Sequence, residues 1–425
     1  MVPVILALRE SQLLEPYVVN TGQHADLVVP ILDAAGITAD VDLRISRPGA
    51  TINSLVSDCI RAFDDMLMLL RGGPERRARP RLFGAAEHPG SPYPALTLVH
   101  GDTSSAMAVA LASIGCKLPV VHVEAGLRTR DILSPFPEEL NRQLISRITS
   151  FHLAPTPANF ANLVREGVDA GRVFITGNTG IDAFHWAASL ESPWPDPRLE
   201  VLDDPAVSLV VVTAHRRENW GAPLDRIVEA VRRVAIRRPK VLVVWPVHPN
   251  PLVRNAVESR LSDIPNVVLT EPIDYIPFAR LLKRADLAIS DSGGIQEEAP
   301  SVGTPVLVAR EESERPEGVE AGTLVLVGSD TDKIETLALP LLDDPQMRHR
   351  MTDVTNPFGD GHAAQRIRAA LEHLVFDTPA PTSYGGAFSR EKVLEAAGYE
   401  HREIDFTSRK IAEAHPEVVQ SSQAQ

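Results

Sequence analysis

One turn in the second half of the chain carries the residues best suited to bind an anion. The apolar run Leu287 to Ile289 is followed by Asp291 and then by Ser292-Gly293-Gly294, where helix-favouring residues begin. Glycines let the backbone approach a ligand, and the start of a helix presents free N–H groups and a positive dipole end. Arg315 offers a donor fork to an oxyanion, and Glu298 could accept hydrogen bonds from a ribose. The pattern favours a phosphate site over an ordinary βα turn with surface charges.

Acidic residues in the first half also follow predicted strands. Asp102 comes after a strand over 95–99, and Glu124 comes after a strand over 119–123. An acid at Glu124 would be partly buried and would need a partner such as Arg128. Asp102 could instead cap a helix, and Glu138 could be a first-turn acid of the helix that it opens. The residues alone leave these alternatives open.

Histidines occupy the equivalent strand ends in the second half. His215 is followed by Arg216 and Arg217 after a strand over 207–213, and His248 follows a strand over 241–245. Such a cluster would clamp a diphosphate, although a loop histidine is the simpler alternative. No metal-ligand spacing, G-x-G-x-x-G or P-loop occurs, so neither a metal nor a cofactor is expected.

These residues require a scaffold that brings strand ends together. Strands and helices alternate in two separate runs, over about 95–176 and 207–342. This alternation predicts an α/β fold of two doubly wound Rossmann-like domains with parallel sheets. Ligands of such sheets bind beyond the carboxyl ends of the strands. We therefore expect an active site in the interdomain cleft that takes a sugar nucleotide, with the sugar on the first domain and the diphosphate on the second.

The flanking stretches predict further elements. The segment 71–94 is rich in Arg, Pro and Gly and predicts a mobile surface insertion. The tail from Thr378 has one helical patch over 389–397, and its end is expected to be disordered. The other expected elements are helices over 3–11, 26–35, 51–70 and 356–372 and a strand over 15–20.

Composition bounds the function. A formal charge of −14 over 425 residues argues against nucleic-acid binding. No apolar run is long enough for a membrane span, and residues 1–10 lack the features of a signal peptide. The two cysteines, Cys59 and Cys116, are too few for a disulfide scaffold and suit a reducing compartment. We expect a cytoplasmic protein that binds neither nucleic acid nor membrane.

A series of motifs resembles the non-hydrolysing UDP-N-acetylglucosamine 2-epimerases, in order from about Val2 to about Leu374. These motifs are H-G-D-T, H-V-E-A-G-L-R-T, S-P-F-P-E-E-L-N-R, T-G-N-T, T-A-H-R-R-E-N, P-V-H-P-N-P, D-S-G-G-I-Q-E-E-A-P, E-R-P-E-G-V-E-A-G-T and N-P-F-G-D-G. The resemblance implies a glycosyltransferase-B architecture with an N-terminal domain over 1–182, a UDP-binding domain over 183–356, a helix over 357–376 that crosses back, and an extension over 377–425, partly disordered. It also implies a homodimer.

The resemblance further implies an activity and a set of residues. The family interconverts UDP-N-acetylglucosamine and UDP-N-acetylmannosamine through 2-acetamidoglucal and UDP, without a redox cofactor, and supplies cell-surface polysaccharides. Asp102 and Glu138 would transfer protons at C2, Glu124 would hold the sugar and His215 would meet the leaving phosphate. The implied substrate-binding residues are Arg142, Arg216, His248, Phe278, Ser292, Gly293, Gly294, Glu298 and Arg315.

The chain also departs from the family pattern. Met1-Val2-Pro3 aligns with a helix that follows the family's first strand and G-T-R-P-E-A loop, so that strand is expected to be missing and the true start to lie upstream. Gln23-His24-Ala25-Asp26 replaces a Gln-His-Arg-Gln segment tied to allosteric binding of the substrate. Three other functions stay open: epimerisation of a modified UDP-diacetamido sugar, glycosyl transfer, and binding of a UDP-sugar by a catalytically impaired protein.

Overall fold

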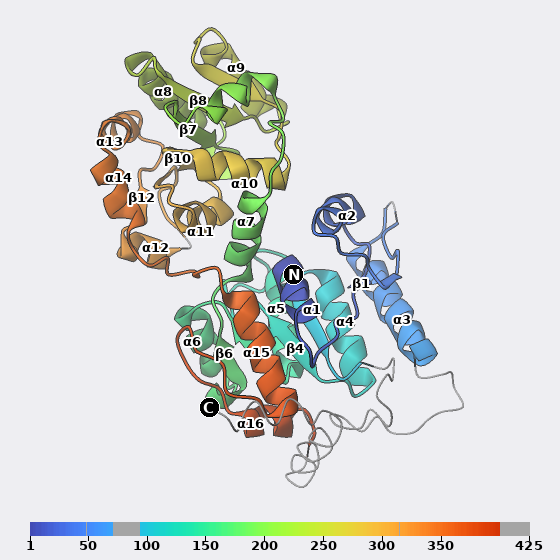
Figure 1. Ribbon diagram of the computed structural model, residues 1–425. Helices are drawn as coiled ribbons and strands as arrows, with labels where there is room; N and C mark the ends of the chain where they lie inside the picture. Colours follow the sequence, from blue (N-terminus) through green and yellow to red (C-terminus); the bar gives the residue numbers. More distant parts are fainter. Residues whose placement is uncertain (48, 71–93, 314, 400–425) are drawn as a thin grey trace. The chain divides into compact units, whose positions relative to one another are not determined.

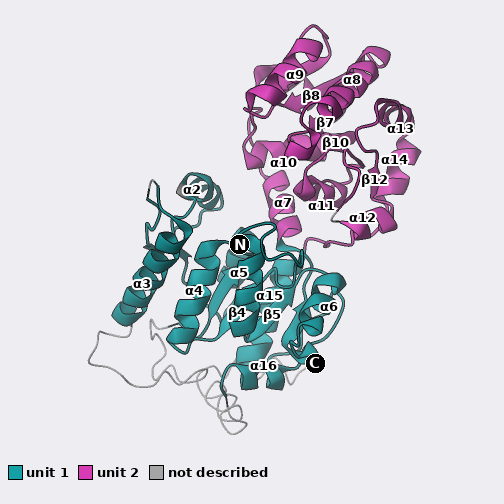
Figure 2. Cartoon of the chain, turned by 180° about the vertical axis from the view of Figure 1, so that it is seen from behind, with its two compact units in different colours: residues 1–179, 362–425 teal, residues 180–361 magenta. Residues whose placement is uncertain are grey.

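The computed structural model describes residues 1–47, 49–70, 94–313 and 315–399. Contacts divide the chain into unit 1, Met1–Thr179 with His362–Gln425, and unit 2, Gly180–Gly361 (Figure 2). Each unit is built on a parallel sheet with helices against it (Figure 1), which confirms the expected α/β class. Most of the predicted insertion at 71–94 and the end of the tail, from residue 400, fall outside the described residues.

The sheet of unit 2 has six parallel strands in the order β12-β11-β10-β7-β8-β9. Strand numbers rise outward on both sides of the β7–β10 pair, so the direction of winding reverses there. This is the topological switch point, where open α/β sheets bind ligands. The strands are β7 Ser208–Thr213, β8 Val241–Pro246, β9 Val267–Thr270, β10 Leu287–Ser290, β11 Val306–Val308 and β12 Leu324–Leu326.

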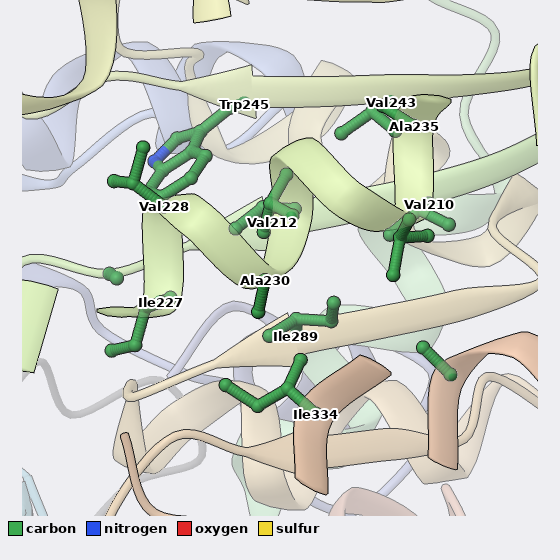
Figure 3. Close-up of a cluster of buried hydrophobic side chains, with 14 of the residues drawn as sticks. Val210, Val212, Ile227, Val228, Ala230, Ala235, Val243, Trp245, Ile289 and Ile334 are labelled. Atoms are coloured by element: carbon green, nitrogen blue, oxygen red, sulfur yellow. The ribbon is translucent and has the colours of Figure 1, made fainter. Parts of the chain in front are cut away.

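Alternation of apolar residues along the strands of unit 2 fills two core layers. Val210 and Val212 of β7 pack with Ile227 and Val228 of the amphipathic helix α8 and with Trp245 of β8 (Figure 3). The intervening β7 residues, Leu209 and Val211, join the cluster on the other face. This period of two is what a strand covered on both faces requires. The helices are α7 Thr179–Ser189, α8 Ala222–Arg237, α9 Pro251–Leu261, α10 Tyr275–Arg284, α11 Gly293–Ser301, α12 Pro316–Ala321, α13 Thr331–Asp343 and α14 Pro345–Thr352.

The main sheet of unit 1 has parallel strands in the order β3-β4-β5-β6, and β1 and β2 form a separate parallel pair. One face of the main sheet packs on α1 and α15, and the cluster on the other side holds residues of α3, α4 and α5. The strands are β1 Val19–Asn20, β2 Val41–Asp42, β3 Thr97–His100, β4 Val120–Val123, β5 Phe151–Ala154 and β6 Val173–Ile175. The helices are α1 Val2–Arg9, α2 Ala25–Ala34, α3 Ile52–Leu70, α4 Ser104–Gly115, α5 Glu138–Ile148, α6 Pro157–Arg165, α15 Ala363–Phe376 and α16 Arg390–Ala396.

The sequence patterns predicted most of these helices and strands correctly, but two predicted elements differ from the structure. The strand expected over 15–20 is reduced to Val19–Asn20. The late helix begins at Ala363 rather than near residue 356, because Pro357 lacks a donor and Gly361 takes a φ of +79°. Helices over 3–11, 26–35 and 51–70 are confirmed as α1, α2 and α3, and the backbone N–H of Ser54 donates to Thr51 Oγ1 at 3.2 Å.

The tail beyond α15 packs on unit 1 as far as residue 399. The predicted helical patch is α16, and its cap Ser389 accepts a hydrogen bond from the backbone N–H of Lys392. The Phe388 ring lies 4.6 Å from that of Phe151 and 5.1 Å from that of Phe174. The extension therefore contributes aromatic surface to the core of unit 1.

Candidate active site

In unit 2, the candidate residues gather at the switch point of the sheet. His215 follows β7, and Ser292 follows the neighbouring strand β10. Ser292 is the N-cap of α11, yet its side chain makes no capping hydrogen bond. Gln296, fully buried one turn later, donates to the Ser292 carbonyl instead. Among the described residues no partner occupies the Ser292 hydroxyl, and the first N–H groups of a helix suit an anion.

Two arginines converge on the glycines of this turn. A Cβ placed on Gly293 would lie 3.3 Å from Arg216 Nη2 and 3.7 Å from Arg315 Nη2. Arg315 Nε is fixed by Glu297 at 2.6 Å, so its Nη2 end is the part aimed at Gly293. Two guanidinium groups above the N-terminus of a helix form a strongly anion-binding arrangement.

Glu298 lies beside Gly294, at the same turn. A Cβ on Gly294 would be 3.8 Å from Glu298 Oε2. Burial, assisted by the charge of Glu297, raises the pKa of Glu298 from 4.5 to about 7. A half-buried carboxylate that ionises near neutrality is suited to accept hydrogen bonds from ligand hydroxyls. Phe278 lies on α10 and packs against the core cluster that also contacts Tyr275.

His215 and His248 stack on each other at the ends of β7 and β8. Their ring centroids are 5.7 Å apart and the rings are within 8° of parallel. His248 Nδ1 accepts the backbone N–H of Asn250 at 3.1 Å, so its Nε2 carries the proton when the ring is neutral. His215 Nδ1 lies 3.4 Å from the buried carboxylate of Asp291.

In unit 1, Asp102 is held by an arginine from the helix that Glu138 opens. Arg142 Nε donates a hydrogen bond to Asp102 Oδ2 at 2.8 Å, and Arg142 Nη2 lies 2.7 Å from the same oxygen as an ion pair. Both contacts reach Oδ2, and Oδ1 accepts no hydrogen bond from the described residues. Asn141 Nδ2 donates to the Asp102 backbone carbonyl at 2.8 Å. The turn is therefore fixed while one carboxylate oxygen stays available for chemistry.

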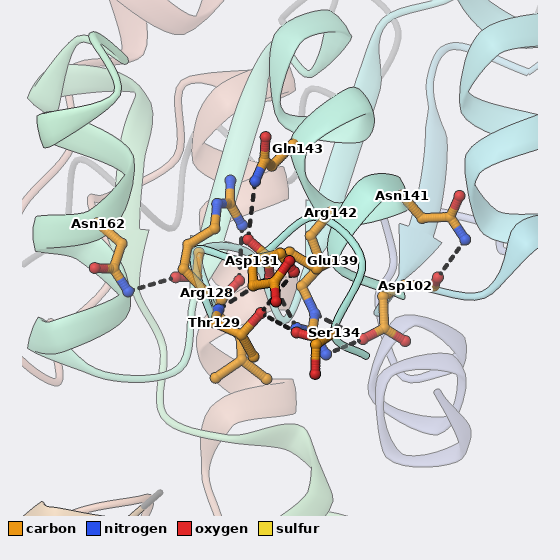
Figure 4. A network of polar contacts seen from close by, with 12 residues as sticks. Asp102, Arg128, Thr129, Asp131, Ser134, Glu139, Asn141, Arg142, Gln143 and Asn162 are labelled. Atoms are coloured by element: carbon orange, nitrogen blue, oxygen red, sulfur yellow. Dashed lines mark hydrogen bonds and ion pairs between the residues drawn. The ribbon is translucent and has the colours of Figure 1, made fainter. Parts of the chain in front are cut away.

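Arg142 is itself anchored by a second acid, Glu139 (Figure 4). The Glu139 side chain is fully buried and accepts from Arg142 at 3.1 Å, from Gln143 at 3.0 Å and from the backbone N–H of Thr129 at 3.0 Å. Burial opposes its ionisation, but these hydrogen bonds outweigh burial and lower the pKa of Glu139 below its ordinary value. Glu139 is thus an ionised anchor for the arginine that holds Asp102.

Glu124 lies at the same strand ends in an unusual backbone conformation. Its φ is +66°, and a Cβ on Gly101 would be 3.4 Å from Glu124 Oε2. His100 Nε2 is 3.7 Å from that oxygen. The suggestion that Arg128 pairs with Glu124 is wrong, because Arg128 forms a bidentate pair with Glu166 at 2.7 and 3.0 Å. A non-glycine residue at positive φ carries backbone strain, so the surrounding contacts must hold Glu124 in this conformation.

Glu138 is the first residue of α5 and is half-buried, and its carboxylate makes no hydrogen bond within the described part of the chain. Unit 1 therefore gathers Asp102, Glu124 and Arg142 at one end of its sheet, with Glu138 one turn before Arg142. Unit 2 brings together the Ser292-Gly293-Gly294 turn with two arginines and two histidines, which are Arg216, Arg315, His215 and His248.

Sequence reasoning missed the residues that hold these groups in place. The sequence pattern predicted a role for Glu138 and not for Glu139. The spacing of three residues between Glu139 and Arg142 on one helix could have predicted their ion pair. Asp291 was read only as part of a turn. His122 donates to the Gly101 carbonyl at 2.8 Å, and burial lowers its pKa to about 4, so it is neutral near pH 7.

Among residues 1–47, 49–70, 94–313 and 315–399, no group of three or more His, Cys, Asp or Glu side chains is placed to hold a metal ion. Within the same ranges, no helix combines the length and apolar character of a membrane span.

Fold and site together define an α/β protein of two units, one of which carries a glycine turn with two converging arginines at a topological switch point, the arrangement that suits an anion. Comparison with known proteins identifies the family within this class. Residues 82–372 match the family model described as UDP-N-acetylglucosamine 2-epimerase. A UDP-N-acetylglucosamine 2-epimerase of Yersinia pestis is 40% identical over 378 residues, which cover 88% of this chain and 95% of that protein. One of Bacillus subtilis is 38% identical, covering 91% and 95%.

Solved structures agree. A crystal structure of UDP-GlcNAc 2-epimerase from Neisseria meningitidis, bound to UDP-GlcNAc, is 36% identical with a TM-score of 0.69, covering 87% of this chain and 95% of that one. The chain belongs to the UDP-N-acetylglucosamine 2-epimerase family. These matches confirm the family that the motifs resembled and its two-domain glycosyltransferase-B type of fold. They also confirm that the protein is an isomerase.

Proposed function

We propose that this protein interconverts UDP-N-acetylglucosamine and UDP-N-acetylmannosamine. A base of unit 1 removes the proton from C2, the electron pair forms the C1–C2 double bond, and the bond from C1 to the diphosphate oxygen breaks. UDP and 2-acetamidoglucal stay bound. UDP then adds back to C1 while C2 receives a proton on the opposite face. Acid and base groups on both faces of the ring and stabilisation of the leaving diphosphate are the requirements of this reaction.

The observation that carries the assignment is the fixed carboxylate of Asp102. Arg142 occupies one of its oxygens twice and leaves the other available. Glu138 supplies a second half-buried carboxylate without a hydrogen bond from the described residues, and Glu124 is held beside Gly101. We assign Asp102 and Glu138 to proton transfer at C2 and Glu124 to holding the sugar.

The leaving group is assigned to unit 2. Ser292, Gly293 and Gly294 with Arg216 and Arg315 bind the diphosphate, Glu298 accepts from the ribose, and Phe278 packs on the uracil side. His215, with His248, meets the departing phosphate, and Arg142 keeps the sugar-side acids in place. Two guanidinium groups above the start of α11 would stabilise the charge that develops on UDP.

The test compares turnover of matched variants with UDP-N-acetylglucosamine in the absence of any acceptor. Asp102→Asn and Glu138→Gln should each lose at least about a hundredfold in turnover. Asp33→Asn, an exposed position on α2, is the control and should retain full rate. Near-normal rates in both site variants would refute the assignment. Turnover that appears only when an acceptor is added would favour a glycosyltransferase, and tight UDP binding without turnover would favour a binding protein.

Three finer proposals rest on the family. The protein is proposed to act as a homodimer, to be cytoplasmic and to supply polysaccharide synthesis. Light scattering of the purified chain tests the first, since a monomer mass would contradict it. Comparing kcat/KM for UDP-N-acetylglucosamine and for a UDP-diacetamido uronic acid decides between the plain and the modified sugar.

A further inference from the structure

Asp291 is a buried carboxylate directly behind the ring of His215. Its side chain is fully buried at the end of β10. One oxygen, Oδ2, accepts three hydrogen bonds at 2.9 Å, from the backbone N–H groups of His215 and Arg216 and from Asn219 Nδ2. The other oxygen, Oδ1, completes no hydrogen bond with any residue that the structure describes and lies 3.4 Å from His215 Nδ1.

This arrangement is asymmetric in a way that a purely structural acid does not require. The three bonds to Oδ2 already tie β10 to the turn after β7. A buried carboxylate oxygen without a completed bond is costly unless a cation or a donor faces it. The group that faces Oδ1 is the Nδ1 of a half-exposed imidazole at the phosphate-binding end of the sheet.

We propose that Asp291 is a positioning residue that holds His215 with its Nδ1 protonated and its Nε2 directed to the leaving diphosphate; this rests on the proposed function. With Nδ1–H facing the carboxylate, Nε2 takes up a proton from solvent, which reaches this 43% exposed side chain, and donates it in a hydrogen bond to the departing phosphate oxygen. The imidazolium formed in this way is stabilised by the carboxylate behind it. No bond to carbon is made or broken by either residue.

The neighbouring histidine provides an internal contrast. His248 accepts the backbone N–H of Asn250 at Nδ1, which requires its Nε2–H tautomer when the ring is neutral. The two stacked rings are thus expected to carry opposite tautomers. The tautomer of His248 is set locally by the Asn250 N–H, whereas that of His215 depends on Asp291, which follows a different strand.

The first test reads the tautomers directly in the full-length protein. The ring nitrogens are recorded by 15N NMR at alkaline pH, where an unperturbed imidazole is neutral. Signals are assigned with His215→Asn and His248→Asn. The proposal predicts Nδ1–H for His215 and Nε2–H for His248. An Nε2–H tautomer at His215 in the unsubstituted protein overturns the proposal, whether or not any variant folds.

The second test substitutes the carboxylate. In Asp291→Asn the amide oxygen can keep the backbone donors while the NH2 group faces His215 Nδ1, so the ring should switch to Nε2–H. Turnover should fall by about a hundredfold. Asp286→Asn is the matched control. Asp286 precedes β10, at the end of the strand opposite to His215, and accepts the backbone N–H of Leu209 at 2.9 Å.

The outcomes separate this proposal from the proposed function. A loss of turnover in Asp291→Asn with the His215 tautomer unchanged shows a structural role only and overturns the proposal. Turnover close to that of Asp286→Asn overturns it as well. If the unsubstituted protein shows no epimerisation, the proposed function fails, while the tautomer measurement still decides whether Asp291 sets the state of His215.

Discussion

Removal of Arg142 should destabilise unit 1. Its guanidinium bridges Asp102 and Glu139, and its side chain is only 10% exposed. Replacing it by methionine keeps most of the volume and removes the charge. The fully buried Glu139 then loses its cation, and Asp102 loses both donors to Oδ2.

The magnitude follows from what remains. Leaving a buried charge without its partner costs about 3–5 kcal/mol. Glu139 keeps hydrogen bonds from Gln143 and from the backbone N–H of Thr129, and Asp102, 28% exposed, can be hydrated. Both facts reduce the cost, so we expect the free energy of unfolding to fall by about 3 kcal/mol.

Urea unfolding followed by circular dichroism measures this change. Arg147→Met is the control, because Arg147 is exposed on the same helix and donates to the Glu166 carbonyl. It should change stability by less than about 1 kcal/mol. Adding Glu139→Gln to Arg142→Met should recover part of the loss, because the uncompensated charge disappears.

Equal stability of Arg142→Met and Arg147→Met would refute the reasoning, since it would mean that Glu139 does not depend on Arg142. A loss that Glu139→Gln fails to reduce would also contradict it, because the cost would then lie in packing.

Two further predictions concern unit 2 and the tail. Because the pKa of Glu298 is raised to about 7, its ionised fraction increases about tenfold from pH 6 to pH 8, and UDP affinity relative to Glu298→Gln should increase by up to about that factor. Calorimetry that gives a constant ratio of affinities would contradict this. The same raised pKa means that ionisation of Glu298 lowers the free energy of unfolding as pH rises from 4.5 to about 7. Phe388→Ala should cost about 2–3 kcal/mol in urea unfolding, because it removes the ring contacts with Phe151, Phe174 and His373. Leu27→Ala, at a side chain that is 73% exposed, should cost under about 0.5 kcal/mol, and an equal loss in both would refute a role for the tail in the core.

The strands of both sheets could be predicted because each is a short apolar run closed by a polar turn. The strand predicted over 207–213 is β7, Ser208–Thr213, and the Ser292-Gly293-Gly294 turn follows β10 as the pattern predicts. Period and turn chemistry are local properties, so one sequence suffices to read them. The helix start at Ala363 was missed because the positive φ of Gly361 depends on contacts beyond its neighbours in the chain.

Partnerships between distant residues could not be read in the same way. Arg128 lies four residues from Glu124, yet it pairs with Glu166 on the segment after α6. Asp291 meets the turn after β7, which lies more than seventy residues earlier. Which acid meets which base is decided by the order of strands in the sheet, and a single sequence does not encode that order in its periodicity.

The most direct test of the proposed reaction is proton NMR of the protein with UDP-N-acetylglucosamine in D2O. Elimination and re-addition predict deuterium at C2 together with the signals of UDP-N-acetylmannosamine, because the proton lost from C2 is replaced from solvent. Appearance of UDP-N-acetylmannosamine that keeps the original proton at C2, or no exchange and no new sugar at all, would contradict the account.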